Sequence, residues 1–346
     1  MIPWALAEHL GAAVAGDGPA GAPPGDVAAL CADAAQRVVE ATGMAPSAPL
    51  PTGEAVERRA WIAANLRSLD AMLEPLTARV GEGLGPLEGS VRAAGGVVMA
   101  GEAGALTGLL AQRVLGQYEL VLLDAHSRPR LLLVRPNVLE AASRLDVDPA
   151  SLLRWVCIHE VTHAVQFGAT AWLRGHLAGL MKELVAGMEL GGRPSAPRAP
   201  DVAAVVARLR EGGLVLAFAG AQRRELLDRV QATMALIEGH AEHVMDVVGE
   251  QALPDLPRLR AALDRRRARR RPPLVALLER LLGLDLKLRQ YEQGRVFCDA
   301  VAHAGGQAAL RHAFAGPDLV PTATELADPA AWLRRAGAPR LAAHTT

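Results

Sequence analysis

Apolar residues recur mostly at helical spacing along this chain, so the pattern predicts a mainly helical fold. In the first part of the chain, helices are expected before residue 16, over Val27–Thr42 and from Glu54 to about Glu74. Gly- and Pro-rich stretches at 16–25 and 46–53 separate these helices, and Pro75 is expected to end the third. Residues 83–116 are apolar and rich in glycine, and the pattern indicates another helix there. We therefore expect residues 1–80 to form an N-terminal helical part.

Two short segments in the middle of the chain have the character of β-strands. Tyr118–Asp124 and Arg130–Arg135 are rich in apolar residues, and His126–Pro129 between them has the composition of a turn. This pattern predicts a β-hairpin. An edge strand of such a hairpin can bind an extended substrate through main-chain hydrogen bonds. The alternative is a hairpin that only covers the core, which would show the same sequence pattern.

The second half of the chain is again helical. Long helices are predicted over about 149–168, from Gln222 to Val248 and from Pro273 to Val301. Gly191–Pro197 is the clearest break, and we expect a flexible loop near 191–200. Six arginines lie between Arg265 and Arg271, ahead of two prolines, and they predict an exposed basic turn near 264–273. The Ala-rich end of the chain, 338–346, is expected to be frayed.

Composition supports the helical interpretation and bounds the number of domains. Hydrophobic residues make up 51% of the 346 residues but aromatic residues only 3%, so Leu, Val and Ala must build the core, which favours helix packing. A chain of this length can form one large domain, which we place over residues 1–346 with a metal-binding core at 81–346. The predicted fold is mainly α with a small β-hairpin or sheet.

Charge and cysteine content narrow the choice of partners and compartment. The formal net charge is zero and no aromatic residues interleave with the arginines at 265–271, so nucleic acid and acidic membranes are not expected partners. Cys31, Cys157 and Cys298 lie within helical patterns and indicate small buried residues in a reducing compartment. The chain shows no basic signal-peptide region, and no uncharged apolar run reaches the ~18 residues of a membrane span. These features predict a cytoplasmic protein.

The segment His159–His163 is an HExxH motif inside the helix predicted over 149–168. Histidines four residues apart on a helix lie about 40° from each other around its axis, so both imidazoles can bind one metal ion. Glu160 lies roughly 100° further round, beside the metal, where it can take the proton of a bound water. Asp148 and Pro149 supply an N-cap and a first-turn proline for this helix. The alternative is two histidines that share a helix face without any metal.

A catalytic zinc site needs a third protein ligand and one open position. Gln166 and Ala169 stand where the metzincin pattern requires a glycine and a histidine, which excludes that class of protein. The third ligand must therefore come from another helix.

The helix predicted over 222–248 is the best source of that ligand. Glu238 lies on its apolar face, where a carboxylate is costly unless a metal or a counter-charge neutralises it. The neighbouring Gly239 leaves little bulk and is expected to let this helix approach the HExxH helix closely. One turn further on, Glu242 can accept a hydrogen bond from a ligand histidine. The competing ligands are the two histidines of this segment, His240 and His243.

The layout HEVTH, followed about 75 residues later by EGHAE, resembles that of the gluzincins. The wider chain is similar to an actinobacterial family of zincin-like hydrolases, often labelled zinc-dependent metalloproteases and sometimes linked by name to coenzyme F420 biosynthesis. The segments that carry this resemblance span most of the chain: 132–137, 155–167, 238–246, 287–294 and 327–332. The resemblance implies a zincin-like metallopeptidase domain, zinc on His159, His163 and Glu238, and Glu160 as general base. Glu242 departs from the aspartate that is usual at its position.

The chemistry expected of such a site is hydrolysis of a peptide or amide bond by a zinc-activated water, with Glu160 as the base. The developing oxyanion also needs a hydrogen-bond donor, and the candidates are Tyr291, His240 and His243. Tyr291 is expected to share a helix face with Lys287. A tyrosine that only packs between helices, beside a lysine whose charged end reaches solvent, would show the same spacing. A non-catalytic binding protein on the same scaffold and a small-molecule amidase are the alternative functions. The intact Glu160 argues against the first of these, because a purely structural metal site has no use for it.

Overall fold

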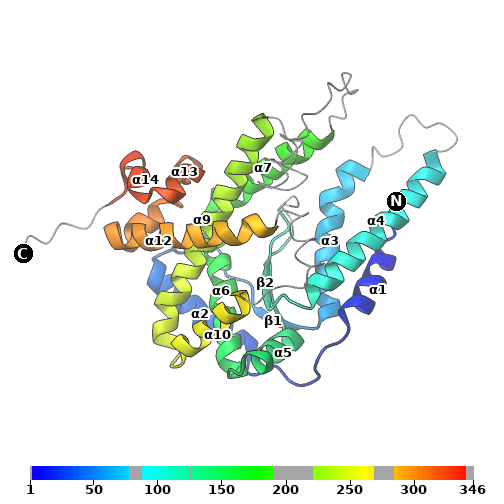
Figure 1. Cartoon of the computed structure of the whole chain (residues 1–346), viewed down its shortest axis with the longest axis horizontal. Coiled ribbons are helices and arrows are strands. Elements are labelled where there is room, and N and C mark those ends of the chain that lie inside the picture. Colours follow the sequence, from blue (N-terminus) through cyan, green and yellow to red (C-terminus); the bar gives the residue numbers. More distant parts are fainter. Residues whose placement is uncertain are drawn as a thin grey trace, which may run out of the picture. The chain divides into compact units, whose positions relative to one another are not determined.

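The computed structural model of the chain is mainly helical and contains a small three-stranded β-sheet (Figure 1). It describes residues 2–77, 88–122, 124, 127–189, 221–268 and 284–339. Within these ranges, only the backbone is described for residues 72–77, 88, 90–92, 185–189, 221–224, 266–268 and 284–292. The predicted mainly α fold with a small sheet is confirmed.

Packing divides the chain into two compact units. The first comprises residues 1–37, 49–164 and 249–266, and the second comprises 38–48, 165–248 and 267–346. Helices α2 (Val27–Thr42), α6 (Pro149–Ala169) and α9 (Ala221–Ala252) contribute residues to both units. The expected single domain over 1–346, with parts at 1–80 and 81–346, remains a prediction.

The sheet belongs to the first unit and has the strand order β1–β3–β2. Strand β2 (Gly116–Glu119) pairs antiparallel with β3 (Arg130–Val134), which confirms the predicted hairpin pairing. Strand β2 begins two residues before the expected range of 118–124 and ends at Glu119, and His126 of the expected turn is outside the described residues. The side chains of 131–134 are all buried, as expected for the central strand of a covered sheet.

Strand β1 (Gly53–Val56) includes residues 54–56, which were predicted to be helical, so the expected helix start at Glu54 is wrong. This strand pairs in parallel with β3. Local propensity does not include such a partner, because the residues of β3 that pair with β1 lie 78 positions further along the chain. The helix that follows, α3, runs from Arg58 to Thr77 and passes Pro75, where we expected it to end.

Helices α1 (Trp4–Ala15) and α4 (Glu88–Ala111) pack closely within the first unit. Glycines make this approach possible, because a Cβ at Gly104 would lie only 2.4 Å from the carbonyl oxygen of Ala7. Within the described ranges, Ala93–Ala111 is the one helical stretch that could cross a membrane, judged by length and composition alone. In this structure, 28% of its most apolar window is buried. Helix α5 (Arg135–Leu145) follows β3 in the same unit.

The second unit contains α7 (Ala171–Glu189), most of α9, and α12 (Leu284–His312). Helix α9 extends slightly beyond its predicted range at both ends, whereas α12 runs well past the expected end at Val301. Its last part follows a break at Gly306, which has a φ of 67°. Among the described residues, this unit also contains η2 (Pro317–Leu319), α13 (Ala323–Ala327) and α14 (Pro329–Arg335).

The basic turn predicted near 264–273 is wrong for residues 264–268, the part of it that the structure describes. Helix α10 (Leu256–Ala268) continues through Arg265–Arg267, so the first arginines are helical. The rest of that turn lies outside the described residues, as do the expected loop at 191–200 and the tail from residue 340.

Candidate metal centre

Helix α6 carries both histidines of the HExxH motif, as predicted. It begins at Pro149, and the Ser151 N–H donates a hydrogen bond to Asp148 Oδ2 at 2.8 Å. This bond, together with one from the Ser151 side chain, holds the pKa of Asp148 below its usual value. The expected N-cap is therefore confirmed, and the helix start that positions the histidines is set by residues local to it.

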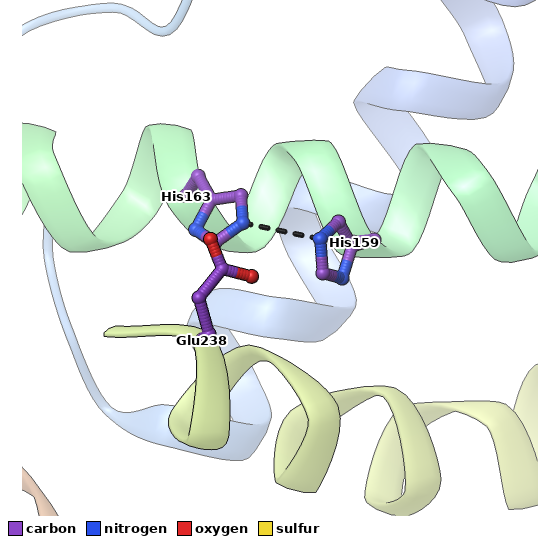
Figure 2. Close-up of side chains that lie close together, drawn as sticks. All are labelled: His159, His163 and Glu238. Atoms are coloured by element: carbon purple, nitrogen blue, oxygen red, sulfur yellow. Dashed lines mark hydrogen bonds between the residues drawn. The ribbon is translucent and has the colours of Figure 1, made fainter. Parts of the chain in front are cut away.

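The side chains of His159, His163 and Glu238 lie close enough together to hold a metal ion (Figure 2). The two Nε2 atoms are 3.2 Å apart, and the rings meet edge to face with their centroids 4.7 Å apart. One ligand atom from each of the three residues lies within 4.8 Å of the others. Across the described part of the chain, this is the one group of three or more His, Cys, Asp or Glu side chains so arranged.

This donor set fits zinc. Zinc binds imidazole nitrogen and carboxylate oxygen at roughly 2.0–2.2 Å in a tetrahedron, which places neighbouring donor atoms roughly 3.3–3.6 Å apart. The 3.2 Å between the His159 and His163 nitrogens already matches that separation. The 4.8 Å span of the whole group is wider, so the three side chains would have to close by about an ångström or more around an ion.

A buried glutamine holds the helix segment that carries Glu238. Gln166 follows His163 by three residues on α6, and its Nε2 donates to the carbonyl oxygen of Ile237 on α9 at 2.8 Å. Both residues belong to the second unit. Because Ile237 directly precedes Glu238, this bond ties the ligand-bearing segment of α9 to the helix of the histidines.

Gly239 does not have the role that the sequence suggested. A Cβ at this position would lie 2.1 Å from the carbonyl carbon of Gly294 and 2.6 Å from the nitrogen of Arg295, both on α12. The expected close approach of Gly239 to the HExxH helix is therefore corrected, because the glycine serves the contact between α9 and α12. A Cβ at Gly294 would in turn lie 2.0 Å from the carbonyl oxygen of Ala235, so the two glycines share one helix crossing.

Glu160 points toward strand β2 within the first unit. Its Oε2 accepts a hydrogen bond from the backbone N–H of Tyr118 at 2.8 Å, and the residue is only 8% exposed. A Cβ at Gly116 would lie 2.8 Å from the Glu160 Cγ, so this glycine leaves the space that the carboxylate needs. The predicted hairpin thus contacts the expected general base directly.

The two rival ligands of α9 contact other residues. His240 is 1% exposed, its Nδ1 lies 2.9 Å from Gln166 Nε2, and its ring packs edge-on against Phe314. His243 Nδ1 lies 2.7 Å from Asp299 Oδ1, and Gln307 Nε2 lies 3.0 Å from its other ring nitrogen. Neither histidine belongs to the group of His159, His163 and Glu238.

Three further site predictions stay predictions. Glu242 is buried, at 9% exposure, as a partner of a ligand histidine would be. The side chain of Tyr291, like that of Lys287, is outside the described residues. A role for His240 as oxyanion donor is also untested, although its burial and its contact with Gln166 argue against it.

Gln166 and the Tyr118 N–H are two groups at this site that were not predicted. Gln166 carried a signal, since it is a polar residue within an apolar run one turn beyond His163. The Tyr118 N–H carried none, because any residue except proline supplies the same backbone donor.

Comparison with known proteins gives the chain a context. A family model described as zincin-like metallopeptidase matches residues 2–333. Among solved structures, the chain is similar to a protein from Chloroflexus aurantiacus described as a candidate hydrolase with a novel fold. That similarity has a TM-score of 0.71 and 28% identity, and it covers 97% of this chain and 98% of the other. A search of curated proteins found no match. The family model and the structural neighbour both indicate a hydrolase.

Proposed function

Because the chain belongs to the zincin-like metallopeptidase family, we propose that it is a zinc-dependent hydrolase that cleaves peptide bonds. The metal ligands in this proposal are His159, His163 and Glu238. The observation that supports it most directly is the convergence of these three side chains, with a histidine nitrogen separation suited to zinc.

Zinc, when bound, supplies a Lewis acid and lowers the pKa of a coordinated water to about 7. The chain's own contribution is the placement of Glu160, whose carboxylate is buried and held by the Tyr118 N–H. In that position Glu160 accepts a proton from the attacking water and returns it to the leaving amine. The hydrogen bond from the Tyr118 N–H holds the Glu160 carboxylate in one orientation.

Three free, buried cysteines suit a reducing compartment, and we place the protein in the cytoplasm on that ground. The small-molecule amidase and the non-catalytic binding protein remain the alternatives. An amidase would use the same residues on a smaller substrate. A binding protein would keep the metal but have no turnover.

Metal analysis of purified variants tests the proposal. We expect about one zinc per chain in the wild type, loss of that zinc in His163→Ala, and a much weaker affinity in Glu238→Gln than in His240→Ala. The exposed His9 provides a control, because His9→Ala removes an imidazole from α1 and should leave zinc binding unchanged. Full zinc occupancy in His163→Ala would overturn the ligand assignment.

A second measurement separates the enzyme from the binding protein. Glu160→Gln should retain zinc and the fold but lose hydrolysis of a fluorogenic peptide library. Turnover in that variant equal to the wild type would remove Glu160 from the mechanism. Absence of turnover in the wild type across peptide and small amide substrates would favour the binding protein.

A further inference from the structure

Gln166 is a buried side chain that the proposed mechanism does not use. It is 0% exposed, and its amide nitrogen makes two close contacts on α9. Nε2 lies 2.8 Å from the carbonyl oxygen of Ile237 and 2.9 Å from Nδ1 of His240. These two residues stand on either side of Glu238 and Gly239 in the sequence.

The chemistry of these contacts defines the orientation of the amide. A backbone carbonyl only accepts hydrogen bonds, so the group facing Ile237 must be the NH2 and not the Oε1 of Gln166. The NH2 has two protons, which allows it to donate to the carbonyl and to His240 Nδ1 together. His240 then carries its own proton on Nε2. The geometry therefore uses both donors of one side chain to bind α9 around the position of Glu238.

Gln166 contacts the main chain of α9 at Ile237, so it restrains the backbone segment that carries Glu238. The Ile237 carbonyl already faces the helical N–H of residue 241, and Gln166 binds its second lone pair. A bond to the main chain restrains both the rotation and the axial position of α9, whereas a side-chain contact would restrain only a rotamer. Since the three ligand atoms span up to 4.8 Å, a small shift of this segment decides whether Glu238 can complete a zinc shell.

We propose that Gln166 is a positioning residue that holds α9 so that Glu238 reaches the metal bound by His159 and His163, and that it thereby sets zinc affinity. This inference rests on the zinc site of the proposed function. It assigns a task to the position where the metzincin pattern would have had a glycine.

Zinc affinity, measured by competition with a chromogenic chelator, tests the inference without any substrate. Gln166→Met keeps the length and the packing of the side chain but removes both donors. We expect this variant to raise the Kd for zinc by about 10- to 100-fold, the usual loss when a partner of a metal ligand is removed. Gln166→Glu should show a similar loss, because a carboxylate can still pair with His240 but cannot donate to Ile237. If Gln166→Met does not fold, the zinc affinity of Gln166→Glu tests the inference instead.

The chain contains a matched control. Gln112 Nε2 donates to the carbonyl oxygen of Val14 at 2.7 Å, which is the same type of bond at an exposed place in the first unit. Gln112→Met should leave zinc affinity within about twofold of the wild type. If Gln112→Met loses as much zinc affinity as Gln166→Met, the loss in both variants comes from general destabilisation of the protein, and the inference is overturned.

A double-mutant comparison separates positioning from a merely structural role. If Gln166 acts through Glu238, then Gln166→Met should cause no further loss of zinc affinity in a Glu238→Gln background. Additive losses would overturn the inference, as would unchanged affinity in Gln166→Met when the wild type binds one zinc. A wild type that binds no zinc would instead overturn the proposed function, so the two failures are distinguishable.

Discussion

Replacing Gly239 by alanine should destabilise the protein, although alanine is normally the better helix residue. The added Cβ would lie 2.1 Å from the Gly294 carbonyl carbon, 2.3 Å from its oxygen and 2.6 Å from the Arg295 nitrogen. Ordinary contacts begin at 3.4 Å, so α9 and α12 would have to separate by about 1.3 Å at their crossing. All three neighbours are backbone atoms, which cannot rotate aside as a side chain does.

Two opposing effects determine the size of this loss. Alanine gains about 1 kcal/mol over glycine inside a helix. Overpacking typically costs about 1–3 kcal/mol, and a contact with rigid backbone belongs at the upper end of that range. The expected net loss in the free energy of unfolding is therefore about 2 kcal/mol. Because Glu238 directly precedes Gly239, the displacement of α9 should also move this proposed ligand and lower the affinity for zinc.

Urea unfolding followed by circular dichroism measures this loss. Gly175 on α7 is the matched control, because it is an exposed helical glycine whose added Cβ would meet nothing within 4 Å. Gly175→Ala should therefore stabilise the protein by up to about 1 kcal/mol. If Gly239→Ala is as stable as the wild type, or stabilised like Gly175→Ala, then the α9–α12 crossing does not require a glycine at position 239.

Two further predictions concern other parts of the chain. Burial raises the pKa of Glu325, but hydrogen bonds from Arg335 and Thr322 outweigh it and leave that pKa below 4.5. The stability contributed by the carboxylate should therefore be complete above about pH 4.5 and disappear as the pH falls through the lowered value. Urea unfolding should show Glu325→Gln less stable than the wild type by about 1 kcal/mol at pH 7, with a smaller gap at pH 3, and a constant gap would contradict this. The thiols of the native protein should react very slowly with an aromatic disulfide reagent at pH 8. A hydrogen bond with Cys31, together with burial, raises the pKa of Cys157, and burial raises the pKa of Cys298. Denatured protein should yield three thiols per chain, and rapid labelling of any thiol in the native state would contradict the burial.

The helix of the histidines could be predicted because its determinants are local. Asp148, Pro149 and the four-residue spacing of His159 and His163 act within a few turns of one helix, and the structure places all of them as expected. Glu238 was a weaker inference, since it relied on the cost of a carboxylate on an apolar face. The structure does bring it beside the histidines.

Two of the errors share one physical origin, which is contact between segments far apart in the chain. The residues around Glu54 have an acceptable helical pattern, but β3 offers their backbone a row of hydrogen-bond partners that no local rule registers. Gly239 was correctly identified as a site of close approach, but the sequence did not contain the identity of its partner, α12.

Local sequence thus determined the ligand types, their spacing and the helices that carry them, because capping and periodicity operate over a few residues. Only the tertiary structure decided which backbone groups support the site. The N–H of Tyr118 at Glu160 and the carbonyl of Ile237 at Gln166 are present in almost any sequence. They acquire a role because packing brings them to those side chains and removes water as their alternative partner.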